Sequence, residues 1–197
     1  MRRSSRVRAV EMPTVAQLEK YLRHERRRIH YHYTLSTTIS AILSVAAAAC
    51  LIAMLWLPVL RVYGGSMAPT LNSREVIVSV KTSQVEEGDI VAFYCNNKLL
   101  VKRIIAGPGD VVDIDANGGV SVNGTLLDEP YVEKLARGEC DVEFPCRVPD
   151  NKYFVLGDHR ETSVDSRSSS VGFVSADDIV GRCAAKVWPL DNFGLIQ

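Results

Sequence analysis

The hydrophobic pattern of this 197-residue chain changes twice along its length. Shortly after Pro13, apolar residues recur at helical spacing, with Val15, Leu18 and Leu22 on one face. Residues 34–60 then carry no charged side chain, and as a helix this run is long enough to cross a bilayer core of about 30 Å. We therefore predict a short amphipathic helix followed by a transmembrane helix over residues 34–60.

Beyond residue 60 the pattern becomes one of short β-strands. Runs rich in β-branched residues are bounded by Gly, Pro and Asn, and Asn117-Gly118 and Asn123-Gly124 are turn signals on either side of one such run. The predicted strands are Glu75–Lys81, Asp89–Cys95, Leu99–Ile105, Val111–Asp115, Val120–Val122, Tyr153–Leu156 and Ile179–Val187. We expect a mainly β fold, in which the N-terminal transmembrane helix precedes an all-β domain over residues 61–197.

Charge is as unevenly distributed as hydrophobicity. Residues 1–33 hold nine Lys or Arg against three Asp or Glu, whereas residues 61–197 hold fourteen against twenty. Because basic residues favour the cytoplasmic side of a membrane span, residues 1–33 are expected to form a cytoplasmic tail on anionic lipids, with residues 1–12 disordered. The β-domain would then lie outside the cytoplasm of a single-pass cell-membrane protein. A cleaved signal peptide is the alternative, but its charged leader would be unusually long.

The five cysteines indicate no metal site, because none forms a CxxC pair or a His/Cys cluster at ligand spacing. Cys140 and Cys146 enclose a short acidic loop, and spacing alone leaves open whether they form a disulfide outside the cell. Cys50 is interpreted as a small apolar residue of the span, and Cys95 and Cys183 as buried thiols of strands. We expect no cofactor, and no nucleic-acid partner because no DNA-binding module is recognisable.

Two residues of the predicted β-domain suggest nucleophilic catalysis. Ser66 follows two glycines, which let the backbone approach a ligand closely, so its hydroxyl could attack a carbonyl group. Strand alternation puts Lys102 on the same face as Leu100 and Ile104, where burial would disfavour the charged form of the lysine. A neutral lysine can act as the general base for a serine. Each signal alone is also typical of an ordinary loop or a solvent-reaching lysine, but together they predict a Ser/Lys dyad.

Six segments rich in small, polar and charged residues follow one another along the chain. They are Gly65-Ser66-Met67-x-Pro69-Thr70-Leu71, Gly88-Asp89-Ile90-Val91, Lys102-Arg103-Ile104-x-x-x-Pro108-Gly109-Asp110, Gly157-Asp158-x-Arg160-x-x-Ser163-x-Asp165-Ser166-Arg167, Gly172-Phe173-Val174 and Ile179-Val180-Gly181-Arg182. In this order they resemble the conserved boxes of bacterial type I signal peptidases, in the compact single-span Gram-positive form. The resemblance extends over residues 35–197.

The resemblance implies an all-β catalytic domain of a membrane-bound serine endopeptidase. Such an enzyme removes N-terminal signal peptides from exported preproteins after Ala-x-Ala-like sites, through an acyl-enzyme. The implied partners are those signal peptides and the lipid bilayer, with the secretion translocon as a further candidate.

The resemblance also assigns roles to individual residues. The nucleophile of the family matches Ser66, and its general base matches Lys102. Ser163 matches a serine that hydrogen-bonds the lysine, while Asp165 and Arg167 match a structural ion pair beside the site. The residues that match positions lining shallow pockets for small substrate side chains are Val62, Met67, Leu71, Leu100 and Val101.

Gly64 and His159 depart from the family pattern. Gly64 stands where some members have a serine whose hydroxyl completes the oxyanion hole. The sequence therefore does not identify the second donor to the oxyanion. His159 replaces a common asparagine. Together with Ser66 and either Asp158 or Asp165, His159 offers a Ser/His/Asp triad as an alternative to the dyad.

Two other classes of protein compete with this interpretation. A sortase-like transpeptidase would use Cys183, but it needs a downstream arginine, and only Lys186 follows. A substrate-dedicated or non-catalytic paralogue could act in the assembly of surface proteins or pili. Such a paralogue would usually have lost Ser66 or Lys102, and both are present here.

Overall fold

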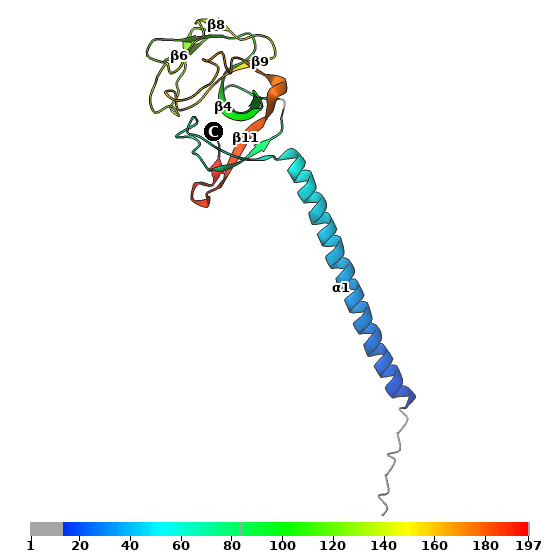
Figure 1. Cartoon of the computed structure of the whole chain (residues 1–197). Coiled ribbons are helices and arrows are strands. Elements are labelled where there is room, and N and C mark those ends of the chain that lie inside the picture. Colours follow the sequence, from blue (N-terminus) through cyan, green and yellow to red (C-terminus); the bar gives the residue numbers. More distant parts are fainter. Residues whose placement is uncertain (1–13, 83, 197) are drawn as a thin grey trace, which may run out of the picture. The chain divides into compact units, whose positions relative to one another are not determined.

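The structure is a computed structural model that describes residues 14–82 and 84–196 (Figure 1). One long helix, α1 (Val15–Trp56), is followed by antiparallel β-sheets, which confirms the predicted fold class. The chain divides into two compact units, Met1–Ile52 and Ala53–Gln197. The prediction that residues 1–12 are disordered lies outside the described residues.

Helix α1 is continuous where the sequence predicted an amphipathic helix and a separate span. Within Leu18–Ala53 it contains an 18-residue stretch with a mean hydropathy of 2.0, which is long and apolar enough to cross a membrane. The helix ends at Trp56, so the predicted end of the helical span at Leu60 is wrong. Pro58 accounts for the difference, because the residue before a proline is disfavoured in the α conformation.

The larger sheet of the β-unit has eight strands. They are β1 (Val59–Arg61), β2 (Val76–Val80), β3 (Ile90–Cys95), β4 (Lys98–Ala106), β9 (Lys152–Leu156), β10 (Val174–Ser175), β11 (Ile179–Trp188) and β12 (Gly194–Leu195). Their order is β1-β2-β11-β3-β4-β9-β10, with β12 paired to β11, and every pairing is antiparallel. Short 3₁₀ helices, η1 (Ala176–Asp178) and η2 (Leu190–Asn192), flank β11 in sequence.

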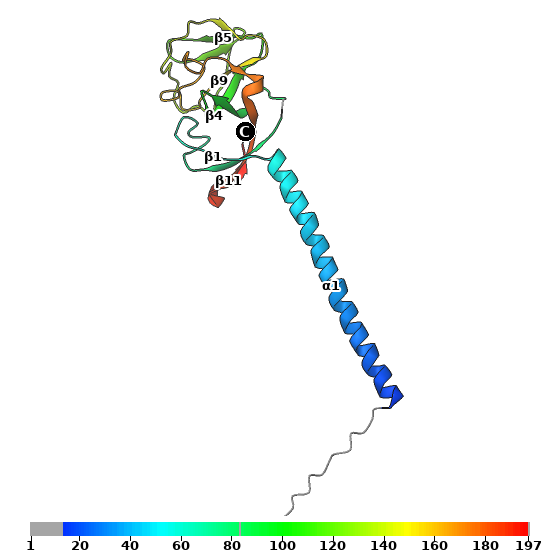
Figure 2. The same cartoon turned by 45° about the vertical axis from the view of Figure 1, so that its right-hand side comes forward.

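The smaller sheet has four strands, in the order β7-β6-β5-β8. They are β5 (Val111–Ile114), β6 (Val120–Val122), β7 (Thr125–Leu126) and β8 (Cys146–Arg147). This sheet interrupts the larger one in sequence, since all four strands come between β4 and β9. In the β-unit it lies at the end away from β1 (Figure 2).

Each predicted strand is present, and each of its ends lies within one residue of the predicted end. The strands that the sequence did not predict are β1, β7, β8, β10 and β12, of two or three residues each. A run this short cannot display the alternation of apolar and polar residues that identifies a strand. The first two residues of β1, Val59 and Leu60, also lay inside the predicted transmembrane run, because both are apolar.

Three apolar clusters form the core of the β-unit. One lies between the two sheets and includes Val112, Phe154 and Leu156. A second contains Met67 and Leu71, which come from the connection between β1 and β2. The third packs Val91, Ile104 and Val155 on one face of β3, β4 and β9. Lys102 lies on β4 opposite Val91, which belongs to this third cluster.

Candidate active site

Ser66 lies in a turn between β1 and β2 that its own neighbours attach to the core. The Leu71 N–H donates to the carbonyl of Met67 at 2.8 Å, which forms one helical turn directly after Ser66. Met67 and Leu71 are buried in the second cluster, whereas Ser66 itself is half-buried. The serine hydroxyl is therefore held at the surface on a segment whose apolar side chains fix its position.

Lys102 contacts Ser66 directly. Its Nζ atom donates a hydrogen bond to Ser66 Oγ at 2.7 Å, across 36 residues of sequence. Lys102 is only 3% exposed, and it lies on β4, an inner strand with β3 on one side and β9 on the other. The sequence placed Lys102 on the same face as Leu100 and Ile104, and these two residues pack in one cluster.

The environment of Lys102 lowers the pKa of its ammonium group. Burial lowers the pKa of the ammonium group from 10.5 to about 8, and the positive charge of Arg167 acts in the same direction. The carboxylates of Asp165 and Asp158 oppose this shift, since a negative charge stabilises the ammonium. With a pKa of about 8, roughly a tenth of the lysine is neutral at pH 7.

The loop after β9 holds the backbone of Ser66. The N–H of His159 donates to the carbonyl oxygen of Ser66 at 3.0 Å. Gly157 fits between this carbonyl and the side chain of Ser163, and a Cβ atom on Gly157 would collide with both. This close packing requires glycine at position 157 and brings three distant parts of the sequence together around the serine.

Ser163 is placed beside the site but without the partner that the resemblance implies. Its side chain is buried, and Ser163 Oγ is the one buried side-chain polar atom of the described residues that lacks a hydrogen-bond partner. A hydrogen bond from Ser163 to Lys102 therefore stays a prediction. An unsatisfied buried hydroxyl this close to the nucleophile turn is unusual, because such groups are normally paired.

Asp165 and Arg167 form the predicted ion pair. The guanidinium group donates two hydrogen bonds to the carboxylate, both at 2.8 Å, and both side chains are almost fully buried. Asp165 also accepts from the N–H of Gly157 at 3.0 Å. Arg167 donates further to the carbonyls of Ala136 and Arg137. The pair thus joins the loop that contacts Ser66 to the segment between β7 and β8.

A second buried ion pair was not singled out from the sequence. Arg103 donates to both carboxylate oxygens of Asp158, at 3.0 and 2.9 Å, and Asp158 also accepts from Thr70 Oγ1 at 2.6 Å. Asp158 therefore connects β4 to the turn that carries Ser66. The charged residue directly after Lys102 on an inner strand was an available signal, since it requires a buried partner.

The residues assigned to substrate pockets fall in two places. Val62, Met67 and Leu71 are buried in the second cluster, against which half-buried Val101 packs. Leu100, also half-buried, packs against the third cluster. Their contact with a substrate stays a prediction.

The alternative base, His159, and the alternative nucleophile, Cys183, are arranged less favourably than Lys102 and Ser66. His159 Nδ1 lies 2.9 Å from Thr162 Oγ1, and among the described residues no imidazole contacts Ser66 Oγ. Asp158 and Asp165, the other members of the alternative triad, are paired with arginines. Burial raises the pKa of the Cys183 thiol to about 12, which disfavours the reactive thiolate.

The backbone around Ser66 offers one donor for an oxyanion. Gly64 has a φ of 90°, a conformation that favours glycine, and its N–H already donates to Ser73 Oγ at 3.3 Å. None of the hydrogen bonds among the described residues uses the N–H of Ser66. That N–H is therefore free to stabilise negative charge that develops on a substrate carbonyl.

The cysteines are all free thiols in the described part of the chain, so Cys140 and Cys146 are not joined by a disulfide. Cys183 is buried as predicted, but Cys95 is only half-buried. No cluster of His, Cys, Asp or Glu among residues 14–82 and 84–196 could hold a metal ion.

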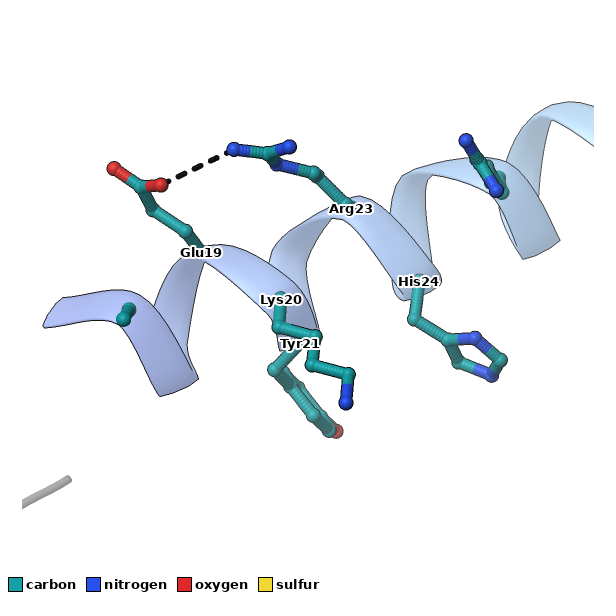
Figure 3. Close-up of a pocket in the computed structure, with 7 residues that line it drawn as sticks. Glu19, Lys20, Tyr21, Arg23 and His24 are labelled. Carbon is teal, nitrogen blue, oxygen red and sulfur yellow. Dashed lines mark hydrogen bonds and ion pairs between the residues drawn. The ribbon is translucent and has the colours of Figure 1, made fainter. Parts of the chain in front are cut away.

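Two hollows differ in their chemistry. The first lies along the N-terminal turns of α1, where Glu19 and Arg23 form an exposed ion pair at 3.2 Å (Figure 3). A single exposed helix does not enclose a substrate. The second is a cleft of about 140 Å³ that includes Ala68 and His159, next to the nucleophile turn.

Comparisons with known proteins identify the family to which the sequence is similar. Residues 35–188 match the family described as signal peptidase, peptidase S26. The chain is 38% identical over 143 residues to a probable signal peptidase I-2 of Synechocystis sp., over 66% of this chain and 63% of that protein. It is 38% identical over 150 residues to signal peptidase IB of Staphylococcus aureus, over 66% of this chain and 77% of that protein. A crystal structure of a signal peptidase I from Enterococcus faecalis gives a TM-score of 0.43 at 29% identity, over 50% of this chain and 96% of that chain.

Proposed function

Because the chain belongs to the signal peptidase family, peptidase S26, we propose that it is a membrane-anchored serine endopeptidase that removes signal peptides from exported preproteins. The observation that carries the catalytic part of this proposal is the 2.7 Å contact between Lys102 Nζ and Ser66 Oγ. A lysine that is 3% exposed and has a pKa of about 8 is suited to act as a base near neutral pH.

In the acylation step, neutral Lys102 accepts the hydroxyl proton as Ser66 Oγ bonds to the substrate carbonyl carbon. The N–H of Ser66 stabilises the oxyanion. The bond to the amide nitrogen then breaks, and the Lys102 ammonium returns the proton to the departing amine. That amine becomes the N-terminus of the mature protein, while the signal peptide stays esterified to Ser66.

In the deacylation step, Lys102 is neutral again and removes a proton from water. The resulting hydroxide bonds to the ester carbon, Ser66 Oγ departs, and Lys102 returns the proton to it. The signal peptide leaves as a carboxylate. One base thus serves both half-reactions.

Specificity for Ala-x-Ala-like sites is assigned to the apolar residues near the dyad. Leu100 and Val101 precede Lys102 on β4 and are half-buried, and Val62, Met67 and Leu71 belong to the cluster against which Val101 packs. Half-buried apolar side chains suit small substrate side chains. Leu100 and Val101 would contact the signal peptide while Ser66 attacks the bond that follows the second alanine, and the buried Val62, Met67 and Leu71 would shape the pocket from beneath.

The membrane part of the proposal rests on α1 and on charge. Helix α1 would span the bilayer with the basic residues 1–33 in the cytoplasm and the β-unit on the other side. Nine residues lie between Trp56, the end of α1, and Ser66, so an extended chain would span at most about 35 Å between them. Anchoring would confine enzyme and membrane-held preprotein to one surface, beside the lipid bilayer and the secretion translocon, and so raise their effective concentration.

The detergent-solubilised full chain should cleave a secretory preprotein after the second alanine of an Ala-x-Ala site. Product masses locate the cut, and Ser66→Ala protein prepared in parallel reports any contaminating protease. His159→Ala should retain activity within about tenfold, because His159 contributes its backbone N–H rather than its ring. Two unrelated preproteins left intact by the wild type would instead support a substrate-dedicated or non-catalytic paralogue.

Activity should rise with pH through the pKa of Lys102. Below a pKa of about 8 the ammonium form dominates and cannot accept the serine proton, so kcat/KM should fall about tenfold for each pH unit well below that value. The measurement is kcat/KM from pH 5.5 to 9.5 on one preprotein. A rise centred near 6.5, the ordinary pKa of histidine, would contradict a lysine base and favour the triad.

A further inference from the structure

The segment between β7 and β8, residues 127–145, reaches from the smaller sheet to the loop beside Ser66. Its Glu129 and Tyr131 contact that loop through two arginines. We refer to Glu129, Tyr131, Arg103 and Arg160 as the clamp. None of the four takes part in the bond-making and bond-breaking steps, yet together with Asp158 they bury two ion pairs next to the nucleophile turn.

One arm of the clamp consists of Glu129 and Arg160. The guanidinium group donates to both carboxylate oxygens, at 2.9 and 2.6 Å, and the side chains of Arg160 and Glu129 are 1% and 3% exposed. Arg160 Nε also donates to the carbonyl of Gly157 at 3.1 Å. The position of the Gly157 backbone therefore depends on where Glu129 holds the guanidinium group.

The other arm consists of Tyr131 and Arg103. The Arg103 guanidinium carbon lies 3.9 Å from the centre of the Tyr131 ring, and the same guanidinium binds Asp158 with two hydrogen bonds. The Tyr131 hydroxyl donates to Glu129 at 2.9 Å, which joins the two arms. Burial, and then the charge of Glu129, raise the pKa of Tyr131, so the hydroxyl keeps its proton and remains a donor.

Both arms act on the three residues that position Ser66. Gly157 packs against the Ser66 carbonyl, Asp158 accepts from Thr70 in the nucleophile turn, and the His159 N–H donates to the Ser66 carbonyl. A shift in residues 157–159 would therefore move Ser66 relative to Lys102. A displacement of about 1 Å at a reacting group can lower a rate about 100-fold.

Stability alone is a weak reason for such a clamp. A buried ion pair often contributes no more to folding than apolar residues of the same size, because both charges lose their hydration. What two bidentate pairs supply is a defined geometry. We propose that Glu129 is a positioning residue that, through Arg160, fixes the loop 157–159 against Ser66, an inference that rests on the proposed function.

The test compares Glu129→Gln and Tyr131→Phe with Asp128→Asn in the full chain, on one preprotein. Asp128 is the adjacent carboxylate and is less buried than Glu129, so it is the matched control. Glu129→Gln should lower kcat about 10- to 100-fold with KM nearly unchanged, and Tyr131→Phe should lower it less. A loosened loop also exposes Lys102, so the acid limb of the pH profile should move to higher pH in Glu129→Gln. Asp128→Asn should match the wild type in both respects.

Two outcomes would overturn the positioning role. In the first, Glu129→Gln has the same kcat as Asp128→Asn, and the acid limb of its pH profile lies at the same pH. In the second, Glu129→Gln fails to fold while Tyr131→Phe keeps wild-type kcat and pH limb, which would make the clamp purely structural. If the wild type cleaves the preprotein and Ser66→Ala does not, either result overturns the positioning role of Glu129 and leaves the proposed function intact. If the wild type cleaves no preprotein, the proposed function is contradicted, and the positioning role that depends on it is contradicted as well.

Discussion

Replacing Lys102 with methionine should lower kcat/KM by about 10²- to 10⁴-fold, the usual contribution of a general base. Methionine keeps most of the length and volume of the lysine but cannot accept the proton of Ser66. The measurement is the initial rate of preprotein cleavage by the full chain in detergent. Lys98→Met on the same strand is the control, because Lys98 is exposed and should tolerate the change.

The same variant should fold at least as well as the wild type. Burial lowers the pKa of Lys102 from 10.5 to about 8, which corresponds to roughly 3 kcal/mol against the charged form at neutral pH. Removing the charge removes that cost, so loss of activity would come with an unchanged or higher melting temperature. Because Ser66 and Lys102 act as a unit, Ser66→Ala combined with Lys102→Met should be no less active than either alone. Substantial activity in Lys102→Met would contradict the dyad.

The sequence predicted the surroundings of a residue wherever a local pattern determines them. Two-residue alternation along Leu99–Ile105 puts Lys102 on an apolar face, and Lys102 is buried in the structure. Turn glycines before Ser66 likewise indicate an unusual backbone, and Gly64 has a φ of 90°. The pairing of Ser66 with Lys102 was predicted from their complementary chemistry and from the resemblance to signal peptidases, because no local pattern joins residues 36 positions apart.

The clamp could not be predicted in the same way. Glu129 and Arg160 are 31 residues apart, and Arg103 and Asp158 are 55 apart, so each pair depends on how the smaller sheet is inserted between β4 and β9. Glu129 also lies in a segment without regular periodicity, where a carboxylate is expected to face solvent. The burial of a charged residue on an irregular segment is set by tertiary contacts, which leave no local pattern in the sequence.

The end of α1 illustrates a different limit. Hydrophobicity alone extends the span to Leu60, since no charge interrupts residues 34–60. Pairing with β2 takes Val59 and Leu60 into the sheet, where their apolar side chains serve equally well. Apolar composition therefore predicts burial or lipid contact but does not distinguish a helix from a strand, and Pro58 is the local signal that separates them.

Replacing Asp165 with asparagine should reduce the free energy of unfolding by about 3–5 kcal/mol, the usual cost of breaking a buried ion pair from one side. Asparagine has nearly the shape of aspartate, so the packing stays intact, but the Arg167 guanidinium loses its counter-charge while 1% exposed. It keeps the carbonyls of Ala136 and Arg137, which carry no net charge. The measurement is the melting temperature of the full chain in detergent, which should fall by roughly 10 °C.

Asp141→Asn is the control for Asp165→Asn, because Asp141 also accepts two hydrogen bonds, both from Ser169, but at the surface. Asp141→Asn should leave the melting temperature close to that of the wild type, because its side chain stays in contact with water in the folded protein. Adding Arg167→Met to Asp165→Asn should restore part of the lost stability, since the uncompensated charge is then removed. Equal melting temperatures for Asp165→Asn and Asp141→Asn, or a further loss on adding Arg167→Met, would mean that Arg167 stabilises the fold through its backbone acceptors instead of through Asp165.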